Sequence, residues 1–228
     1  MNEMLTQKIR YDFDQIALHE QEVWNHNSHY HNFLLKHLPP HCENVLDIGC
    51  GTGAFSRLLA KRTAKVLAID LSPNMIEVAR QRSKKYTNID FHVADILKQE
   101  FSVEQFDAIV SIATVHHLPI EKLLPNLEVA LKPGGKLVIL DLLEHENLQD
   151  SLSDFIAVPL SWFFQIFRNR HIKQSPAAAA AMREHLRTDK YLFLSQVQQI
   201  YTSLLRGVKV RKHLFWRYSI IWEKSLVD

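Results

Sequence analysis

The feature that most constrains this chain is an apolar run that breaks into three closely spaced glycines. Residues 44–48 are typical of a buried strand, Gly49, Gly51 and Gly53 follow as a turn, and a helix is expected from Ala54. Glycine lets the backbone turn sharply and lets a ligand approach without a Cβ in the way, and the helix N-terminus offers unpaired N–H groups. The pattern indicates a loop that binds a nucleotide-containing cofactor.

The neighbouring carboxylates bear on which cofactor this is. Gly49, Gly51 and Ala54 also match the dinucleotide fingerprint, and Asp70 stands about 20 residues after Gly51, where a ribose-binding acid is expected in either case. Asp47, just before the turn, would repel a pyrophosphate and attract a ligand that carries an ammonium and a sulfonium, as S-adenosylmethionine (SAM) does. A dinucleotide oxidoreductase is the less favoured interpretation, and a helix-capping or turn carboxylate is the structural alternative for Asp47.

Further segments follow the turn in a characteristic order. They comprise residues 68–75, a strand that ends in an acid and leads into a Ser-Pro helix start, and residues 94–96, 106–111 and 131–139. With the glycine turn, this set resembles the Rossmann-like (class I) SAM-dependent methyltransferases over residues 44–144. Residues 215–222 are similar to the closing strand of a small-molecule, type 11-like branch of that family. The resemblance implies an α/β fold with a seven-stranded, mostly parallel sheet, an antiparallel last strand and helices on both faces.

The periodicity agrees with this architecture. Strands are expected near 44–48, 65–69, 89–92, 106–112 and 136–141, and helices near 54–62, 73–83 and 120–131. The last two strand-like runs, 208–214 and 216–222, are too close in sequence for a helical crossover, so they predict an antiparallel hairpin.

The chain length fits one domain. With 228 residues, of which 46% are hydrophobic, residues 1–228 can bury a single core. We expect four parts: a helical cap over 1–41, a cofactor-binding core over 42–144, a lid and substrate insertion over 145–190, and the last helix and β-hairpin over 191–228. The cap and the insertion can both reach the carboxyl ends of the strands, where ligands bind in this fold.

Charge and cysteine usage indicate a cytoplasmic protein with a small-molecule partner. The formal net charge is +2, so no overall field favours nucleic acid. Two cysteines do not make a disulfide framework, and neither a secretory signal nor a transmembrane segment is expected.

The resemblance implies roles for the residues that match the family pattern around SAM, whose product is S-adenosylhomocysteine (SAH). The three glycines would surround the methionine portion and the ribose, Asp47 would lie near the ammonium, and Asp70 would accept both ribose hydroxyls. A carboxylate can accept two hydroxyl donors at once. The remaining expected contacts are Leu71 and Ile96 on the two faces of adenine, Asp95 at its amine, and Ser111 at the methionine carboxylate or the reacting centre.

Candidate bases follow the fourth strand. His117 is the first choice and His116 the second, because an imidazole titrates near neutral pH and both lie at the edge where the methyl group is expected. A purely structural role in positioning the loop is the alternative.

The cap holds a second group of histidines and aromatic residues. They are expected to line a substrate pocket, with Trp162 from the insertion above it, and His29 is a further candidate base; the group comprises Trp24, His26, His29, Tyr30 and His31. No metal site is expected, because the histidine spacing lacks an i, i+4 pair and no carboxylate or cysteine completes the set. Packing of the cap on the sheet is the structural alternative.

These observations predict methyl transfer to an oxygen or nitrogen of a small metabolite, and carbon methylation fits the same motifs. One alternative is an enzyme acting on tRNA or protein, although residues 111–114 (Ser-Ile-Ala-Thr) lack the Asn/Asp-Pro-Pro-Tyr/Phe pattern of amino-methylating nucleic-acid enzymes. The other is a SAM-binding module without catalysis.

Overall fold

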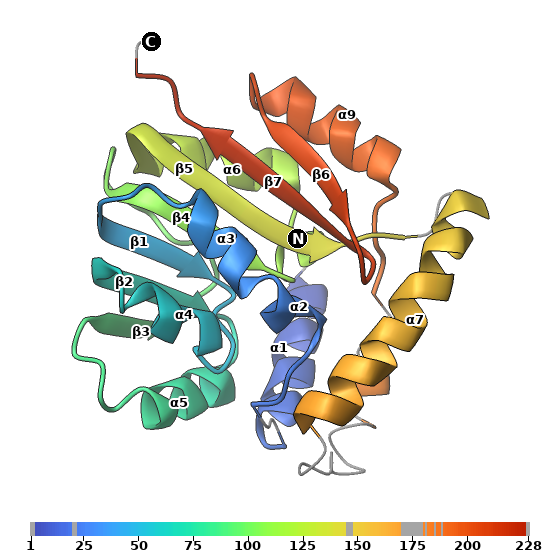
Figure 1. Ribbon diagram of the computed structural model, residues 1–228. Helices are drawn as coiled ribbons and strands as arrows, with labels where there is room; N and C mark the ends of the chain where they lie inside the picture. The colour runs from blue at the N-terminus through green and yellow to red at the C-terminus, as the bar shows by residue number, and fades with distance from the viewer. Residues whose placement is uncertain are drawn as a thin grey trace.

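A single twisted sheet forms the centre of the molecule (Figure 1). The computed structural model describes residues 3–19, 22–144, 148–169, 180, 182–184, 186–187 and 189–226. The strands are β1 (Cys42–Ile48), β2 (Thr63–Asp70), β3 (Ile89–Val93), β4 (Phe106–Ile112), β5 (Leu131–Leu142), β6 (Lys209–His213) and β7 (Arg217–Glu223). Their order is β3-β2-β1-β4-β5-β7-β6, and β7 runs antiparallel to both of its neighbours. The expected seven-stranded, mostly parallel sheet and its terminal hairpin are confirmed.

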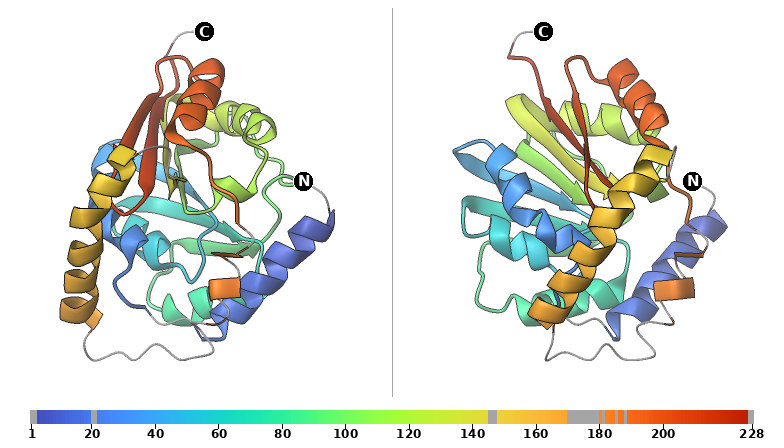
Figure 2. Two further views of the ribbon diagram at one scale, coloured as in Figure 1. Left: turned by 90° about the vertical axis from the view of Figure 1, so that its right-hand side faces the viewer. Right: turned by 45° about the vertical axis from the view of Figure 1, so that its right-hand side comes forward.

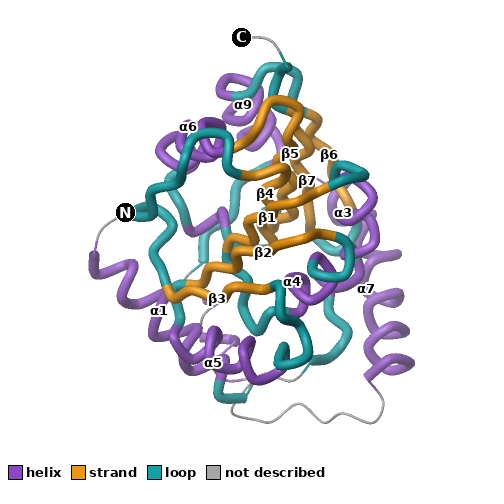
Figure 3. The backbone as a smooth tube through the Cα atoms, turned by 90° about the vertical axis from the view of Figure 1, so that its left-hand side faces the viewer, coloured by secondary structure: helices purple, strands orange, loops and turns teal. Residues whose placement is uncertain are grey.

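Helices cover both faces of the sheet (Figure 3). One face carries α6 (Ile120–Ala130) and α9 (Leu194–Leu204), and the other carries α3 (His31–His37), α4 (Ala54–Leu59) and α5 (Pro73–Arg82). The remaining helices are α1 (Glu3–Ala17), α2 (His26–His29), the short 3-10 turn η1 (Val115–His117) and α7 (Leu148–Asn169). Among the described helices, none has the length and apolar content needed to cross a bilayer.

The two cores follow from alternation along the strands. In β5, Leu137 and Ile139 pack into the cluster beneath α6 and α9, whereas Val138 and Leu140 pack into the cluster beneath α3 and α4. Successive side chains of a strand point to opposite faces, so a continuous apolar run fills both layers. Burying each such side chain contributes roughly 2 kcal/mol, which makes the sheet a rigid platform for its loops.

Local signals set the helix ends. The Ser72 hydroxyl oxygen accepts a hydrogen bond from the Met75 N–H at 3.0 Å, and Pro73 occupies the first turn, so α5 begins where its cap predicts. Helix α4 ends at Leu59, before the expected residue 62. Because β2 already begins at Thr63, residues 60–62 must turn the chain back toward the sheet.

The hairpin brings a strand start to the functional edge of the sheet. Because β7 is antiparallel to β5, its first residue, Arg217, pairs with Leu142 at the carboxyl end of β5. The turn before it places Phe215 and Trp216 at positive φ angles of 60° and 56°. Helices α1 and α7, which belong to the expected cap and insertion, flank this same end of the sheet (Figure 2).

Candidate functional site

A cavity of about 910 Å³ opens at the carboxyl edge of the sheet. Its wall comes from the turn after β1, the segments that follow β2, β3 and β4, the start of β7, and residues of α1 and α2. The volume is typical of a small-molecule or cofactor site. Carboxyl ends of parallel strands are where ligands bind in open α/β sheets, so the fold places the cavity where the sequence predicts a cofactor.

The glycine turn closes on the end of β2. The N–H groups of Gly49 and Cys50 both donate to the Ile69 carbonyl, at 2.8 and 3.0 Å. Gly49 has a φ of 68°, and a Cβ there would lie 2.0 Å from Thr114 Oγ1, so a side chain at this position collides with the segment after β4. Gly49 therefore fixes how closely the turns after β1 and β4 approach each other.

The next two glycines differ in their surroundings. Gly51 lines the cavity, and no atom of the described chain lies within 4 Å of the point where its Cβ would stand. A ligand can therefore lie against the backbone there. Gly53 does not line the cavity; it starts α4 at a φ of 75°, and a Cβ there would lie 2.9 Å from the Phe91 ring. Its role is to pack the helix start against β3.

Asp70 stands at the end of β2 and faces the cavity. Its Oδ2 accepts from the Gly51 N–H at 2.8 Å and its Oδ1 accepts from the Ser72 N–H at 2.9 Å. These bonds fix the carboxylate, and each oxygen keeps capacity for a further donor. Burial raises the pKa of Asp70 to about 6, which the two backbone hydrogen bonds only partly offset.

Asp47 is the deepest acid of the cavity, with 2% of the residue exposed. Its Oδ2 accepts from the Ser56 hydroxyl at 2.6 Å. Helix α4 begins at Gly53 without a side-chain cap, so Asp47 does not cap it. Burial raises the pKa of Asp47 to about 7, because ionisation here costs solvation. A cation bound nearby would recover that cost, which makes this end of the cavity suited to a positively charged ligand.

The three residues expected around adenine all line the cavity, whereas Ser111, expected at the methionine end, does not. Leu71, Asp95 and Ile96 all line the cavity, and Asp95 Oδ1 accepts from the Leu97 N–H at 3.0 Å. Ser111 lies outside the lining, with 1% of the residue exposed, and its hydroxyl donates to a β1 carbonyl at 3.0 Å. Ser111 therefore ties β4 to β1, and the expectation that it faces the reacting centre is corrected.

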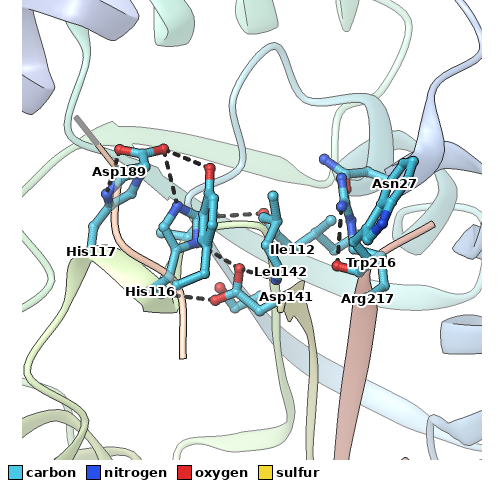
Figure 4. A network of polar contacts seen from close by, with 12 residues as sticks. Asn27, Ile112, His116, His117, Asp141, Leu142, Asp189, Trp216 and Arg217 are labelled. Carbon is cyan, nitrogen blue, oxygen red and sulfur yellow. Dashed lines mark hydrogen bonds and ion pairs between the residues drawn. The ribbon is translucent and has the colours of Figure 1, made fainter. Parts of the chain in front are cut away.

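A histidine and two carboxylates form a buried network on the other side of the cavity (Figure 4). His116 Nδ1 lies 2.6 Å from Asp141 Oδ1, and the His116 main-chain N–H donates to Asp141 Oδ2 at 2.8 Å. His116 Nε2 lies 3.7 Å from Asp189 Oδ2. Burial acts to lower the pKa of His116, but the two carboxylates outweigh it and raise the pKa to about 9. The protonated, ion-paired form of His116 is therefore favoured at neutral pH, which argues against His116 as the base.

His117 takes part in the same network. It lines the cavity, and its Nδ1 lies 3.9 Å from Asp189 Oδ1. The Phe13 ring of α1 meets the His117 imidazole edge-on, at a centroid distance of 5.9 Å. Of the two histidines after β4, His117 is the one that remains a candidate base.

The same three side chains could also approach a metal ion, since ligand atoms of His116, His117 and Asp189 lie within 4.8 Å of one another. Ligation requires a deprotonated imidazole, whereas the pKa of about 9 favours the protonated, ion-paired His116.

The cap contributes two of its histidines to the cavity. His26 and His31 line it together with Trp24. His26 Nε2 lies 2.8 Å from Ser161 Oγ of α7, and its ring stacks on Phe215 at 4.7 Å. Burial lowers the pKa of both histidines to about 4, so both are neutral at pH 7. They form a polar but uncharged wall.

Three expected substrate residues lie away from the cavity. His29 packs edge-on against Trp24 at a ring distance of 6.0 Å, and the Tyr30 hydroxyl donates to the Leu214 carbonyl at 2.8 Å. Trp162 is 68% exposed on α7. These positions do not fit His29 as a base, and they do not fit Tyr30 or Trp162 as substrate contacts. Segments of α2 and α7 turn these side chains toward the hairpin or the solvent.

Several cavity residues were missed by the sequence interpretation. They are Asn27, Asp189 and Tyr191, with Asp141 directly behind His116. Asp141 carried a usable signal, because it ends an apolar strand as Asp47 does. Arg217 belongs to a basic run near the end of the chain, for which a solvated face was the favoured interpretation and a site for an anionic acceptor or a nucleic-acid backbone was the alternative. Asp189 lies at the end of the insertion and Tyr191 directly follows it, and neither belongs to a local sequence pattern.

Comparison with known proteins finds similarity to methyltransferases. A family model described as a methyltransferase domain matches residues 45–135. The demethylmenaquinone methyltransferase of Tropheryma whipplei is 39% identical over 98 residues, which are 42% of this chain and 41% of that protein. An uncharacterized methyltransferase of Mycobacterium bovis is 29% identical over 88% of this chain and 97% of its own length. The N-methyltransferase NodS of Bradyrhizobium japonicum, solved with SAH, superposes with a TM-score of 0.61 at 19% identity, covering 96% of this chain and 98% of that one.

The sheet order and the site at its carboxyl edge define a Rossmann-like methyltransferase fold. Residues 45–135 match the methyltransferase domain model, and the chain is similar to SAM-dependent methyltransferases over this core. The match to the Tropheryma protein spans less than half of that relative, and the family model likewise stops at residue 135. The part shared with the Tropheryma protein and with the family model is the core around the glycine turn, whereas the Mycobacterium bovis relative matches nearly the whole chain.

Proposed function

We propose that this protein is a SAM-dependent methyltransferase that methylates an oxygen or a nitrogen of a small molecule. The observation that carries the proposal is the division of the cavity. Asp47, Asp70 and the open backbone at Gly51 lie on one side, and His117 lies across from them on the same cavity. A cationic nucleoside ligand and a nucleophile with a removable proton can therefore be held together.

The cofactor side fits SAM by the chemistry of its groups. Asp47 would lie near the ammonium, Asp70 would accept the ribose hydroxyls, and Leu71 and Ile96 would enclose the adenine beside Asp95. Burial raises the pKa of Asp47 to about 7 and that of Asp70 to about 6. A bound cation would stabilise the ionised carboxylates, whereas a pyrophosphate would destabilise them. When bound, SAM supplies an activated methyl group, so the protein has little covalent chemistry of its own to perform.

The acceptor side supplies alignment and a proton acceptor. His117 would take the proton from the acceptor O–H or N–H while a lone pair of that oxygen or nitrogen forms the bond to the methyl carbon; the electron pair of the broken methyl–sulfur bond would remain on the sulfur of SAH. Asp189 lies beside the imidazole and would stabilise its charged form. The neutral wall of His26 and His31 can hydrogen-bond an acceptor without repelling the sulfonium. Excluding water and fixing the geometry are the main contributions expected from this wall.

The small-molecule assignment rests on the shape of the site and on the kinds of relative. A cavity of about 910 Å³ suits a cofactor plus a compact acceptor. The Tropheryma relative is named for a quinone precursor and NodS for N-methylation. These names support a metabolite as acceptor without distinguishing between oxygen, nitrogen and carbon.

The test is transfer of label from methyl-labelled SAM into an extract of the source organism, separated by size after nuclease and protease treatment. Label in a low-mass product that survives both treatments supports the proposal. Label that is lost from a high-mass fraction would make the protein an RNA or protein methyltransferase. Asp70→Ala is the inactive variant, and Asp90→Ala is the matched control, because Asp90 is an exposed acid on β3 that pairs with His92.

A further inference from the structure

Two buried arginines line the cavity, and they differ in how their charge is satisfied. Arg57 pairs with the carboxylate of Glu22, and its Nη1 also donates to the Thr52 carbonyl at 2.9 Å. Arg217 makes no ion pair with a carboxylate among the described residues, although only 8% of it is exposed. Burying a guanidinium without an acidic partner costs solvation free energy. A bound anion that is not part of the described chain would offset this cost.

The hydrogen bonds of Arg217 leave one end of the guanidinium open. Nε donates to Asn27 Oδ1 at 2.9 Å, and Nη1 donates to the Phe215 and Trp216 carbonyls at 3.0 and 3.4 Å (Figure 4). Nη2 has no hydrogen bond within the described chain, and it is not among the polar atoms that are buried without a partner. Nη2 is therefore not sealed from solvent, and Arg217 is one of the residues that line the cavity.

Asn27 adds a second donor. Arginine can only donate hydrogen bonds, so the Asn27 amide oxygen must face Arg217 and the amide nitrogen must face away. Asn27 lines the cavity too, and its side-chain nitrogen has no hydrogen bond to any described residue. The pair thus presents a guanidinium nitrogen and an amide nitrogen on one wall, an arrangement suited to two oxygens of one acid group.

The nearest acid does not satisfy Arg217. Asp141 attracts its charge, but the Asp141 oxygens accept from the His116 N–H, from His116 Nδ1 and from the Leu142 N–H. These bonds direct the carboxylate to His116. The phenol of Tyr191 is likewise engaged, because it donates to Asp189 Oδ2 at 3.1 Å.

We infer that Arg217 and Asn27 form a subsite for an acid group, a carboxylate or a phosphate, on the methyl acceptor. The inference rests on the proposed function and narrows its substrate class. The acidic group is an anchor distinct from the atom that receives the methyl group, since Arg217 starts β7 while His117 follows β4. Of the basic side chains near the carboxyl end of the chain, Arg206, Lys209, Arg211 and Lys212 are exposed and away from the cavity, so Arg217 alone among these five carries the role.

The test separates the low-mass extract on an anion exchanger at pH 8 before the label-transfer reaction. Acceptor activity is expected in the retained, salt-eluted fraction. Loss of that activity after phosphatase treatment identifies a phosphate, and survival identifies a carboxylate; both outcomes support the subsite. Acceptor activity in the unretained fraction overturns this inference and leaves the proposed function intact. Absence of label from every fraction overturns the proposed function, and the inference falls with it.

Variants provide a second measurement. Arg217→Gln is expected to raise KM for the retained acceptor by about tenfold or more with little change in SAH affinity, and Arg217→Lys to recover part of the loss. Inorganic phosphate is the binding probe: it should raise the melting temperature of the wild type and not of Arg217→Gln. Arg211→Gln, at an exposed β6 position, is the matched control. A change in kcat with KM and the phosphate response unaltered would reduce Arg217 to a support for the hairpin turn and contradict the subsite.

Discussion

Asp141 accepts two hydrogen bonds from one residue, His116: one from its main-chain N–H at 2.8 Å and one from its Nδ1 at 2.6 Å. The first bond fixes the backbone after β4 and the second fixes the imidazole. A charged pair of this kind couples the loop that carries His117 to the end of β5. The loop position and the protonation of His116 are therefore linked.

This linkage predicts a pH dependence of stability. The pKa of His116 is about 9 in the folded protein and near 6.5 when unfolded, so its stabilising contribution is full below pH 6.5 and disappears as the pH rises through 9. The contribution is about 3 kcal/mol at most. Urea unfolding of the wild type and His116→Gln should show a difference in free energy of unfolding that is large at pH 6 and small at pH 9.5. A difference that stays constant over this range would contradict the charged pair.

The cofactor acids predict a pH dependence of binding. The pKa values of Asp47 and Asp70 are raised to about 7 and about 6, and a cationic ligand favours their ionised forms. SAM affinity should therefore rise between pH 5.5 and pH 7.5, and binding at pH 6.5 should release protons. Calorimetric titration in two buffers of different ionisation enthalpy measures that release. Asp47→Asn should reduce it and weaken binding at pH 7.5 by about tenfold, whereas Asp90→Asn should do neither.

The glycine turn gives a matched pair of substitutions. Gly49→Ala should destabilise the protein by several kcal/mol, about 3 or more, because the new Cβ would lie 2.0 Å from Thr114 Oγ1. Gly51→Ala has open space around its Cβ and carries only the cost of a φ of 52°, about 1 kcal/mol, but it should weaken SAM binding by intruding on the cavity. Thermal and urea unfolding with SAH titration separate the two effects. Thr114→Gly should restore much of the stability lost in Gly49→Ala; no recovery would point to another source of strain.

The base assignment predicts a separation of binding from turnover. His117→Asn should lower kcat by about 100-fold while SAH affinity stays within twofold, since general base catalysis is typically worth this much. His92→Asn, an exposed histidine on β3, is the control and should leave both quantities unchanged. Equal turnover of His117→Asn and the wild type would mean that the acceptor loses its proton without this imidazole.

Much of the cofactor half could be predicted from the sequence because it is encoded locally. The strand, the glycine turn and the carboxylates at strand ends lie within short stretches, and the fixed geometry of a parallel sheet brings Asp47 and Asp70 to one edge. Gly53 and Ser111 were assigned too closely to the ligand, since the same stretches also have to pack α4 on β3 and tie β4 to β1.

The acceptor half depends on contacts between distant segments. Arg217 meets Asn27 across 190 residues of sequence, and His26 meets Ser161 across 135. The hydrophobic periodicity of a sequence indicates local secondary structure and does not predict contacts between such distant residues. His29 and Tyr30 illustrate the consequence: they share a short segment with His26 and His31, yet neither lines the cavity, because one turn of helix α2 decides which side chains face it. Parts of the expected lid over 145–190, among them residues 145–147 and 170–179, lie outside the described residues.

The most direct test of the central claim is calorimetric titration of the protein with SAM and with NADH, alongside the Asp70→Ala and Asp90→Ala variants. The account predicts one SAM bound per chain, no comparable NADH binding, and a loss of about 2 kcal/mol of SAM binding free energy in Asp70→Ala alone, because the fixed carboxylate that accepts the ribose hydroxyls is gone. Unchanged SAM affinity in Asp70→Ala, or tighter binding of NADH than of SAM, would contradict it.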